Sequence, residues 1–504
     1  MEDQKDRERE GESALPEGAA RLFRLLGLHP GVEFSLESAA ALAGERTGPV
    51  RQQLELLAKA GMITQTAPGR FLLPESFRTA AAEQARRDDS EADQARLRLV
   101  SWYLHTADWL GHTLTPYDSY DLKIEVPAGV RPLPFDQPEA ALAWWGSERI
   151  NLVSVVRVAA EAGVHGLAWR LAVTLRSVYA QRGVFADWES TATIAADSAV
   201  AEGDLAGQAL TTENLAKLYA QTGRLEEARL SHRAALAIFG RLADRFGQAR
   251  CHNALGLLAL RHRQLRQART HFQDSSAVFA ELGMTRWVAV ARANTAEALI
   301  GLGGHTEAAQ TLTKTAEVFA ALGDRSSQGN ALALLSRAQR AGGDLTAART
   351  SIDAALAIAA DARNPMWRGY GLLELGRLQR AAGQHEDALH SFQEAAAINR
   401  ELGDRSREAL ALDGAGQTCQ DQGHPEEALA LHQAAEPAHR ESGNHWHQAI
   451  NLHSTATSLD SLGRSPQART CWEQALTALN GFDDPLATQL RRQITLTLDR
   501  LRGR

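Results

Sequence analysis

The sequence predicts a mainly α-helical protein, in which a long superhelix of helical hairpins follows a small helical domain with one β-hairpin. Three observations support this prediction: a 40-residue periodicity in the C-terminal part, glycine at one phase of that period, and a different helical pattern before it. The composition agrees, because 44% of the 504 residues are apolar, 23% are charged and only 6% are aromatic. Such a composition suits a long chain built mainly of helices.

The periodicity rests on an alanine that recurs every 40 residues without slippage. The seven copies are Ala228, Ala268, Ala308, Ala348, Ala388, Ala428 and Ala468. Five residues before each alanine is a turn position, occupied by Gly223, Arg263, Gly303, Gly343, Gly383, Gly423 and Gly463. Glycine frees the chain to turn between two antiparallel helices, so each repeat is expected to be a helical hairpin.

Two further sets of mostly small residues keep the same period. Twelve residues before each alanine stand Ala216, Gly256, Ala296, Ser336, Gly376, Gly416 and Ala456, and seven after it stand Ala235, Ser275, Thr315, Ala355, Ala395, Ala435 and Ala475. Small side chains at these phases let the two helices of a pair approach closely.

The pattern resembles the tetratricopeptide repeat in its 40-residue variety, with joining segments such as LGDR at 322–325 and 402–405. The resemblance covers residues 203–480 as seven repeats and implies a right-handed superhelix. A degenerate copy precedes them, with Gly183 at the turn and Trp188 in place of the alanine, and it is expected to act as a cap. Residues 481–504 have helical apolar spacing and many charges, which predicts a C-terminal capping helix.

The N-terminal third has another organisation. A short helix at RLFRLLGL precedes a second helix that Ser35 can cap and a third that Pro49 opens. MITQTA and RFLL then flank the turn residues 67–69. Three helices followed by a hairpin predict a winged helix-turn-helix domain over residues 18–90. Residues 1–17 are expected to be a disordered charged tail, and residues 91–202 a helical connector that includes the degenerate repeat.

The order of these parts resembles the C-terminal portion of bacterial STAND-type NB-ARC regulators that end in tetratricopeptide repeats. LFRLLGLHPG, WYLHTAD, ALAWWGSERINLVSVV and LAWRLA carry the resemblance. In that family an ATPase domain precedes the winged helix. Here no lysine follows a glycine, so no GxxxxGK[ST] phosphate loop exists, and Pro74 and Glu75 stand where the family has a His-Asp pair. We therefore expect a sensor arm without the ATPase motor and without nucleotide binding.

Charge and cysteine content narrow the function classes further. The formal charge is −7, and the first 17 residues contribute −4 of it, so the rest is nearly neutral and whole-surface nucleic-acid binding is not expected. The three cysteines are far apart and form no CxxC pair, as expected of a cytoplasmic protein. No run of about 18 apolar residues suggests a membrane segment.

The sequence predicts no enzyme, no cofactor and no metal site. Eight of the 17 histidines fall between His385 and His453, but HEDALH spaces its histidines five residues apart, whereas HExxH needs four. We interpret these histidines as surface or packing residues. An enzyme with a metal held by this cluster is a remote alternative.

The resemblance implies a partner-binding groove lined by the first helix of each repeat. The predicted groove residues are Asn253, Asn330, Arg337, Arg340, Tyr370, Arg377, Arg380, Gln417 and Gln420. The four arginines are expected to converge on one patch that suits a carboxylate or phosphate, because each guanidinium can donate two parallel hydrogen bonds. The alternative is an ion network in which Arg377 and Arg380 pair with Asp413 and Glu374.

These observations predict a non-catalytic sensor or adaptor in bacterial regulation or signalling, which binds a protein or peptide with an acidic end in the groove. The alternative is a ligand-sensing transcriptional regulator whose winged helix reads DNA through Arg51, Gln52, Gln53 and Arg70. Mixed charge around the third helix favours the first function, because Glu45 and Glu55 offset the basic residues.

Overall fold

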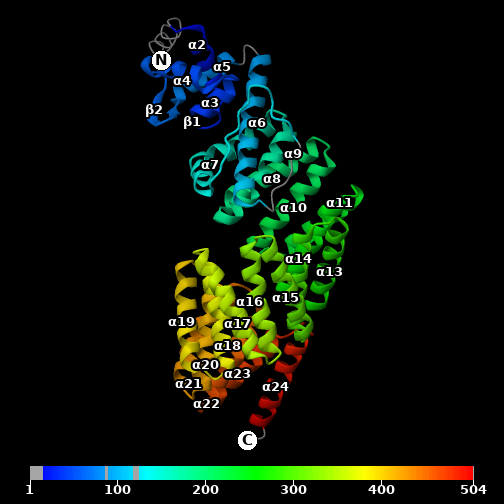
Figure 1. The fold of residues 1–504 in the computed structure, drawn as a ribbon. Helices are drawn as coiled ribbons and strands as arrows, with labels where there is room; N and C mark the ends of the chain where they lie inside the picture. Colours follow the sequence, from blue (N-terminus) through cyan, green and yellow to red (C-terminus); the bar gives the residue numbers. More distant parts are fainter. Residues whose placement is uncertain (1–14, 86–88, 117–123, 503–504) are drawn as a thin grey trace. The chain divides into compact units, whose positions relative to one another are not determined.

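The computed structural model describes residues 15–85, 89–116 and 124–502 (Figure 1). The predicted tail over residues 1–17 lies largely outside these ranges. The chain divides into two compact units, the first ending at Leu242 and the second beginning at Ala243. No helix among the described residues is long and apolar enough to cross a membrane.

The first unit begins with short helices and a small sheet. Its N-terminal elements are α2 (Glu17–Leu26), β1 (Glu33–Ser35), α3 (Leu36–Ala43), α4 (Thr47–Lys59), β2 (Thr64–Ala67) and β3 (Arg70–Leu72). The three strands form an antiparallel sheet in the order β1-β3-β2, so the expected hairpin carries a third strand that the sequence analysis missed. Ser35 caps α3, since its hydroxyl accepts a hydrogen bond from the Ser38 N–H at 3.1 Å. Assignment of this region to the winged-helix class stays a prediction.

Seven further helices complete the described part of the first unit. They are α5 (Glu75–Ala85), α6 (Asp89–Leu114), α7 (Pro138–Glu161), α8 (His165–Arg182), α9 (Phe185–Ala201), α10 (Leu205–Gln221) and α11 (Leu225–Arg241). Large aromatic side chains fill the spaces between them, and Trp144, Trp169 and Trp188 are all buried. The indole N–H of Trp188 donates to the Asn214 side-chain oxygen at 2.8 Å, which satisfies its polar edge.

A buried polar network joins the N-terminal elements to α6 and α7. The Gly31 N–H donates to His29 Nδ1 at 3.1 Å, so His29 Nε2 carries the proton and faces the Tyr103 hydroxyl at 3.3 Å. Tyr103 donates to Glu148 at 2.7 Å, and Arg70 on β3 donates to the same carboxylate at 2.6 Å. Burial lowers the pKa of His29 to about 3, with Arg78 and Arg70 adding to the effect against the Gly31 hydrogen bond.

The second unit is a solenoid of antiparallel helix pairs, followed by one last helix (Figure 1). Its helices are α12 (Arg245–Arg261), α13 (Leu265–Glu281), α14 (Thr285–Gly301), α15 (His305–Ala321), α16 (Arg325–Ala341), α17 (Leu345–Asp361), α18 (Pro365–Ala381), α19 (His385–Glu401), α20 (Arg405–Asp421), α21 (Pro425–Glu441), α22 (His445–Ser461), α23 (Ser465–Ala478) and α24 (Pro485–Arg502). Each first helix, from α12 to α22, begins 40 residues after the one before it. The predicted fold class, a mainly helical solenoid of hairpins, is confirmed.

Small residues explain why the helices of a pair pack so closely. A methyl group added at Gly256 would lie 2.5 Å from the Phe272 ring, and one at Gly376 would lie 2.8 Å from Phe392. The LGDR segments join one pair to the next. In the segment at 322–325, Gly323 takes a φ of 68° and the Asp324 carboxylate accepts a hydrogen bond from the Ser327 N–H at 3.0 Å, which caps α16.

Arg263 occupies a turn where most other repeats have glycine, and it adopts a φ of 55°. Its guanidinium donates to both oxygens of Asp484, each at 2.7 Å, and stacks over the Trp446 ring at 3.4 Å from the centroid. Arg266 adds an exposed pair with Asp483 at 3.2 Å. We call Arg263, Asp484 and Trp446 the clasp, because they tie the α12–α13 turn to α22 and to the loop before α24.

Removing the clasp is expected to destabilise the second unit. Asp484 is 1% exposed, so Arg263→Ala should lower the free energy of unfolding by about 3 kcal/mol, because it leaves a buried carboxylate without its counter-ion. Arg263→Gly should cost about 1 kcal/mol less than Arg263→Ala, since glycine adopts a positive φ without strain. Urea denaturation followed by circular dichroism would measure both variants.

The matched control for the clasp is Arg325→Ala. Arg325 pairs with Asp361 at 2.7 Å, but both side chains are exposed, so its loss should cost less than about 1 kcal/mol. A stability of Arg263→Gly equal to or above that of the unmodified chain would contradict the importance of the clasp.

Acidification should loosen the first unit through His29. Because the folded pKa is about 3 and the unfolded value is 6.5, only the unfolded state binds the proton as the pH falls below 6.5. The stabilisation of the folded state that depends on neutral His29 is therefore complete above pH 6.5 and is lost as the pH falls from 6.5 to 3. Between pH 6.5 and 5.0 the loss should be about 2 kcal/mol. Hydrogen exchange of amides in α3 and α6 should show it, and His29→Gln should reduce the pH dependence.

Candidate binding groove

The first helices of neighbouring repeats pack beside one another, and they carry all the predicted groove residues. Arg337 and Arg340 lie on α16, Tyr370, Arg377 and Arg380 on α18, and Gln417 and Gln420 on α20. The structure brings Arg337, Arg340 and Arg377 together beside acidic partners. Arg380 instead pairs with side chains of α20.

Three of the four arginines act on one buried carboxylate, that of Glu374, and two of them contact it directly. Arg377 donates to Glu374 at 2.5 Å, and Arg340 lies 3.6 Å from it. Arg337 donates to Glu297 on α14 at 3.2 Å. Glu374 is 1% exposed while the arginine side chains are 24–31% exposed, so the acid forms the floor of the patch and the guanidinium groups form its surface.

The charges of this patch stabilise one another. Burial alone would raise the pKa of Glu374, but Arg377, Arg337 and Arg340 outweigh it and hold that pKa below its usual range. Burial lowers the pKa of Arg337, but Glu297 and Tyr370 outweigh it, so the net shift is upward. Burial raises the pKa of Tyr370, which keeps it a neutral phenol. Glu374 is therefore a permanent counter-ion beneath the arginines.

Arg380 has different partners from those considered in the ion-network alternative. It donates to Asp421 at 2.6 Å and to the Gln417 side-chain oxygen at 2.9 Å, both on α20. The pairing of Arg380 or Arg377 with Asp413 is wrong, because Asp413 is buried in another network. The pairing of Arg377 with Glu374 is present.

Asp413 joins three helices. It accepts hydrogen bonds from His432 at 2.9 Å and from His439 at 2.7 Å, both on α21, and from the Asn451 amide on α22 at 2.8 Å. Burial raises the pKa of Asp413, but the two histidine hydrogen bonds outweigh it and lower the net value. These two histidines are packing residues of the kind that the sequence analysis expected.

A pocket of about 310 Å³ opens beside Arg380. Most of its lining comes from three first helices, α18, α20 and α22. The lining residues are Arg380, Gln417, Gln420, Asp421, His432, Ile450, His453, Ser454, Thr457 and Leu490. We call this the groove pocket. It offers amide, hydroxyl and imidazole groups beside one ion pair, and His432 Nε2 has no hydrogen-bond partner among the described residues.

The remaining predicted groove residues lie outside the groove pocket. Asn253 on α12 accepts a hydrogen bond from Asn294 on α14 at 2.9 Å, and Asn330 is exposed on α16. Glu297, His453 and Thr457 were not predicted to line the groove. Glu297 and Thr457 occupy the same position in the 40-residue repeat as Arg337 and Arg377, so that position, applied to every copy, would have identified both.

Of the four residues considered for DNA binding, two are exposed and two are engaged with other side chains of the first unit. Arg51 and Gln52 are exposed on α4, whereas Gln53 donates to Glu45 at 3.2 Å. Arg70 pairs with buried Glu148, contacts Glu33 at 3.5 Å and donates to the Ser147 carbonyl at 3.2 Å. Arg70 therefore belongs to the polar network of the first unit.

Comparisons with known proteins agree with the repeat architecture. The tetratricopeptide repeat family model matches residues 207–281 and 370–441. Regulatory protein AfsR of Streptomyces coelicolor is 28% identical over 319 residues, covering 62% of this chain and 32% of that protein. Its namesake in Streptomyces griseus is 27% identical over 361 residues, covering 71% of this chain and 36% of that protein. The chain thus spans about a third of the length of these relatives.

Solved structures show the same fold at low sequence identity. A STAND protein with a tetratricopeptide repeat sensor from Pyrococcus horikoshii superposes with a TM-score of 0.60 at 14% identity, covering 96% of this chain and 66% of that one. A Rap protein complexed with competence and sporulation factor gives 0.53 at 11% identity, covering 78% of this chain and 99% of that one. The chain contains tetratricopeptide repeats, and it resembles the C-terminal part of STAND-type regulators.

The role of Glu374 as the counter-ion of the arginine patch can be measured. Glu374→Ala should lower the free energy of unfolding by about 3 kcal/mol, because Arg340 and Arg377 lose a buried partner. Asp421→Ala is the matched control, since the Arg380–Asp421 pair is about one third exposed on both sides and should contribute about 1 kcal/mol or less. Urea denaturation would measure both variants. An equal decrease in their free energies of unfolding would show that burial of Glu374 does not strengthen its contribution to stability.

Proposed function

We propose that the chain is a non-catalytic regulatory protein that binds a protein or peptide along the first helices α16, α18, α20 and α22. The observation that supports this proposal best is the groove pocket, where hydrogen-bonding side chains of successive repeats face one cavity. Repeats stacked in this way offer a peptide equivalent contacts at regular intervals.

The chemistry of the groove pocket suits an extended peptide. Gln417 and Gln420 can each donate and accept, and Ser454 and Thr457 provide hydroxyl groups, so together they match the alternating N–H and C=O groups of a peptide backbone. Gln420 is held by Ser458 and Ser461, each at 3.0 Å, which fixes its amide in place.

The arginine patch beside the pocket favours a partner with an acidic end. Four arginines face Glu297, Glu374 and Asp421, which leaves a net charge of 4 − 3 = +1. Each guanidinium has five N–H donors and uses only some of them here, so a carboxylate can still be bound. A partner with one terminal or side-chain carboxylate fits this charge better than a highly acidic one.

A regulatory role is supported by the relatives. Both AfsR proteins are named regulatory proteins, and the Rap protein of similar fold was solved with competence and sporulation factor bound. We do not propose DNA binding as the main function, because Arg70 is engaged with Glu148 in the first unit.

A site-specific photo-crosslinker tests the location of the partner. We would place benzoylphenylalanine at Thr457 in the groove pocket and, as the matched control, at exposed Gln467 on the second helix α23. In lysate of the source organism, one protein or peptide should crosslink at position 457 and not at 467. Equal crosslinking at both positions, or none at 457, would contradict the proposal.

The captured partner then allows the arginine patch to be tested. Replacing Arg337, Arg340, Arg377 and Arg380 together by alanine should weaken binding at least tenfold, or about 1.4 kcal/mol, by isothermal titration. Arg349→Ala with Arg469→Ala is the control, because both arginines lie on second helices and pair locally with Asp353 and Glu473. Unchanged affinity of the quadruple variant with intact helicity would rule out the patch.

A further inference from the structure

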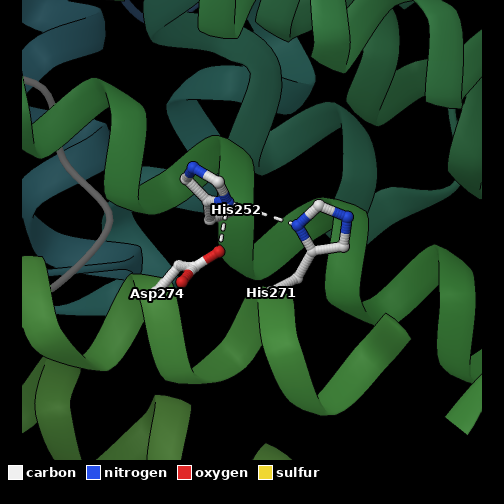
Figure 2. Close-up of side chains that lie close together, drawn as sticks. All are labelled: His252, His271 and Asp274. Carbon is white, nitrogen blue, oxygen red and sulfur yellow. Dashed lines mark hydrogen bonds and ion pairs between the residues drawn. The ribbon is translucent and has the colours of Figure 1, made fainter. Parts of the chain in front are cut away.

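Three potential metal ligands converge between α12 and α13 of the second unit, away from the groove pocket. His252 lies on α12, and His271 and Asp274 lie one turn apart on α13 (Figure 2). His252 Nδ1 lies 3.2 Å from His271 Nδ1 and 3.7 Å from Asp274 Oδ2, and all three ligand atoms lie within 4.8 Å of one another.

We propose that His252, His271 and Asp274 form a binding site for a divalent transition-metal ion of the Zn²⁺ class. Two imidazoles and one carboxylate form a donor set that these ions favour in proteins. No metal site was predicted from the sequence, because these ligands come from two helices and follow no short motif spacing.

The distances between the donors fit a bound ion. A tetrahedral Zn²⁺ with ligands at about 2.0–2.1 Å places neighbouring ligand atoms about 3.4 Å apart. The two distances from His252, 3.2 and 3.7 Å, lie on either side of this value. Helix packing therefore holds the donors near the spacing that an ion requires.

The facing imidazole nitrogens also favour an ion, because the nitrogen of a neutral imidazole is a common ligand of such metals. When the two Nδ1 atoms face each other without an ion, one of them must carry the proton of their hydrogen bond. A metal ion replaces that proton and binds both nitrogen atoms.

The exposure of the site leaves room for a fourth ligand. His252 and His271 are partly buried and Asp274 is exposed, so an ion enters from solvent and keeps one position for water. Because the ligands come from both helices of one hairpin, the ion would hold α12 and α13 together and stabilise that repeat.

Metal titration of the full chain without a histidine tag tests this site. ZnCl₂ should bind with one-to-one stoichiometry in isothermal titration, and CoCl₂ should produce the visible absorption bands of a four-coordinate Co²⁺ complex. His252→Ala, His271→Ala and Asp274→Asn should each weaken Zn²⁺ binding by about tenfold or more. Zn²⁺ should also raise the melting temperature of the unmodified chain and not that of His252→Ala.

His390→Ala is the matched control, since it removes an exposed histidine from the second helix α19. It should bind Zn²⁺ like the unmodified chain. Circular dichroism checks that each variant folds, and Asp274→Asn preserves side-chain shape where alanine does not. Three results would overturn the proposal. The first is unchanged Zn²⁺ affinity in a folded variant that combines the His252, His271 and Asp274 substitutions. The others are an equal loss of affinity in His390→Ala and the absence of stoichiometric binding to the unmodified chain.

Discussion

The close approach of two helices at small residues is the constraint on which the second unit depends. Gly256 and Gly376 lie where even a methyl group would meet the rings of Phe272 and Phe392. Because small residues recur at this position every 40 residues, each first helix is held in the same relation to its partner. Side chains at equivalent positions then fall on one face of neighbouring first helices. The groove pocket and the arginine patch both follow from that alignment.

The parts of the fold that local pattern determines were predictable, and the parts that depend on distant pairing were not. Small residues, turn glycines and capping aspartates act within a few residues of themselves, so the helix pairs follow from the periodicity. The partner of Arg263 lies 221 residues away, so the missing glycine was visible in the sequence and the clasp was not. Strand β1 was missed for a similar reason, because its three residues form a strand only through hydrogen bonding to β3, which lies far along the chain.

In the candidate site, the face of the helix was predictable and the burial of each side chain was not. The 40-residue period places the arginines on one face, but it does not indicate that Glu374 is buried beneath them or that Asp413 faces α21. Long arginine side chains also reach partners beyond their own helix, as Arg380 does with Asp421. The His252 cluster was not predicted because its ligands come from the two helices of one repeat and are brought together only by helix packing.

The clasp and the groove are connected through the geometry of the second unit. A chain of repeats fixed only to its neighbours can bend, and small changes accumulate along it. Tying the α12–α13 turn to the loop before α24 removes this freedom from the repeats between them, which include those that carry the groove pocket. Under the proposed function, a partner would therefore meet side chains whose spacing is already set, and binding would order less of the protein. The arginine turn would then serve the groove by holding the spacing of its repeats.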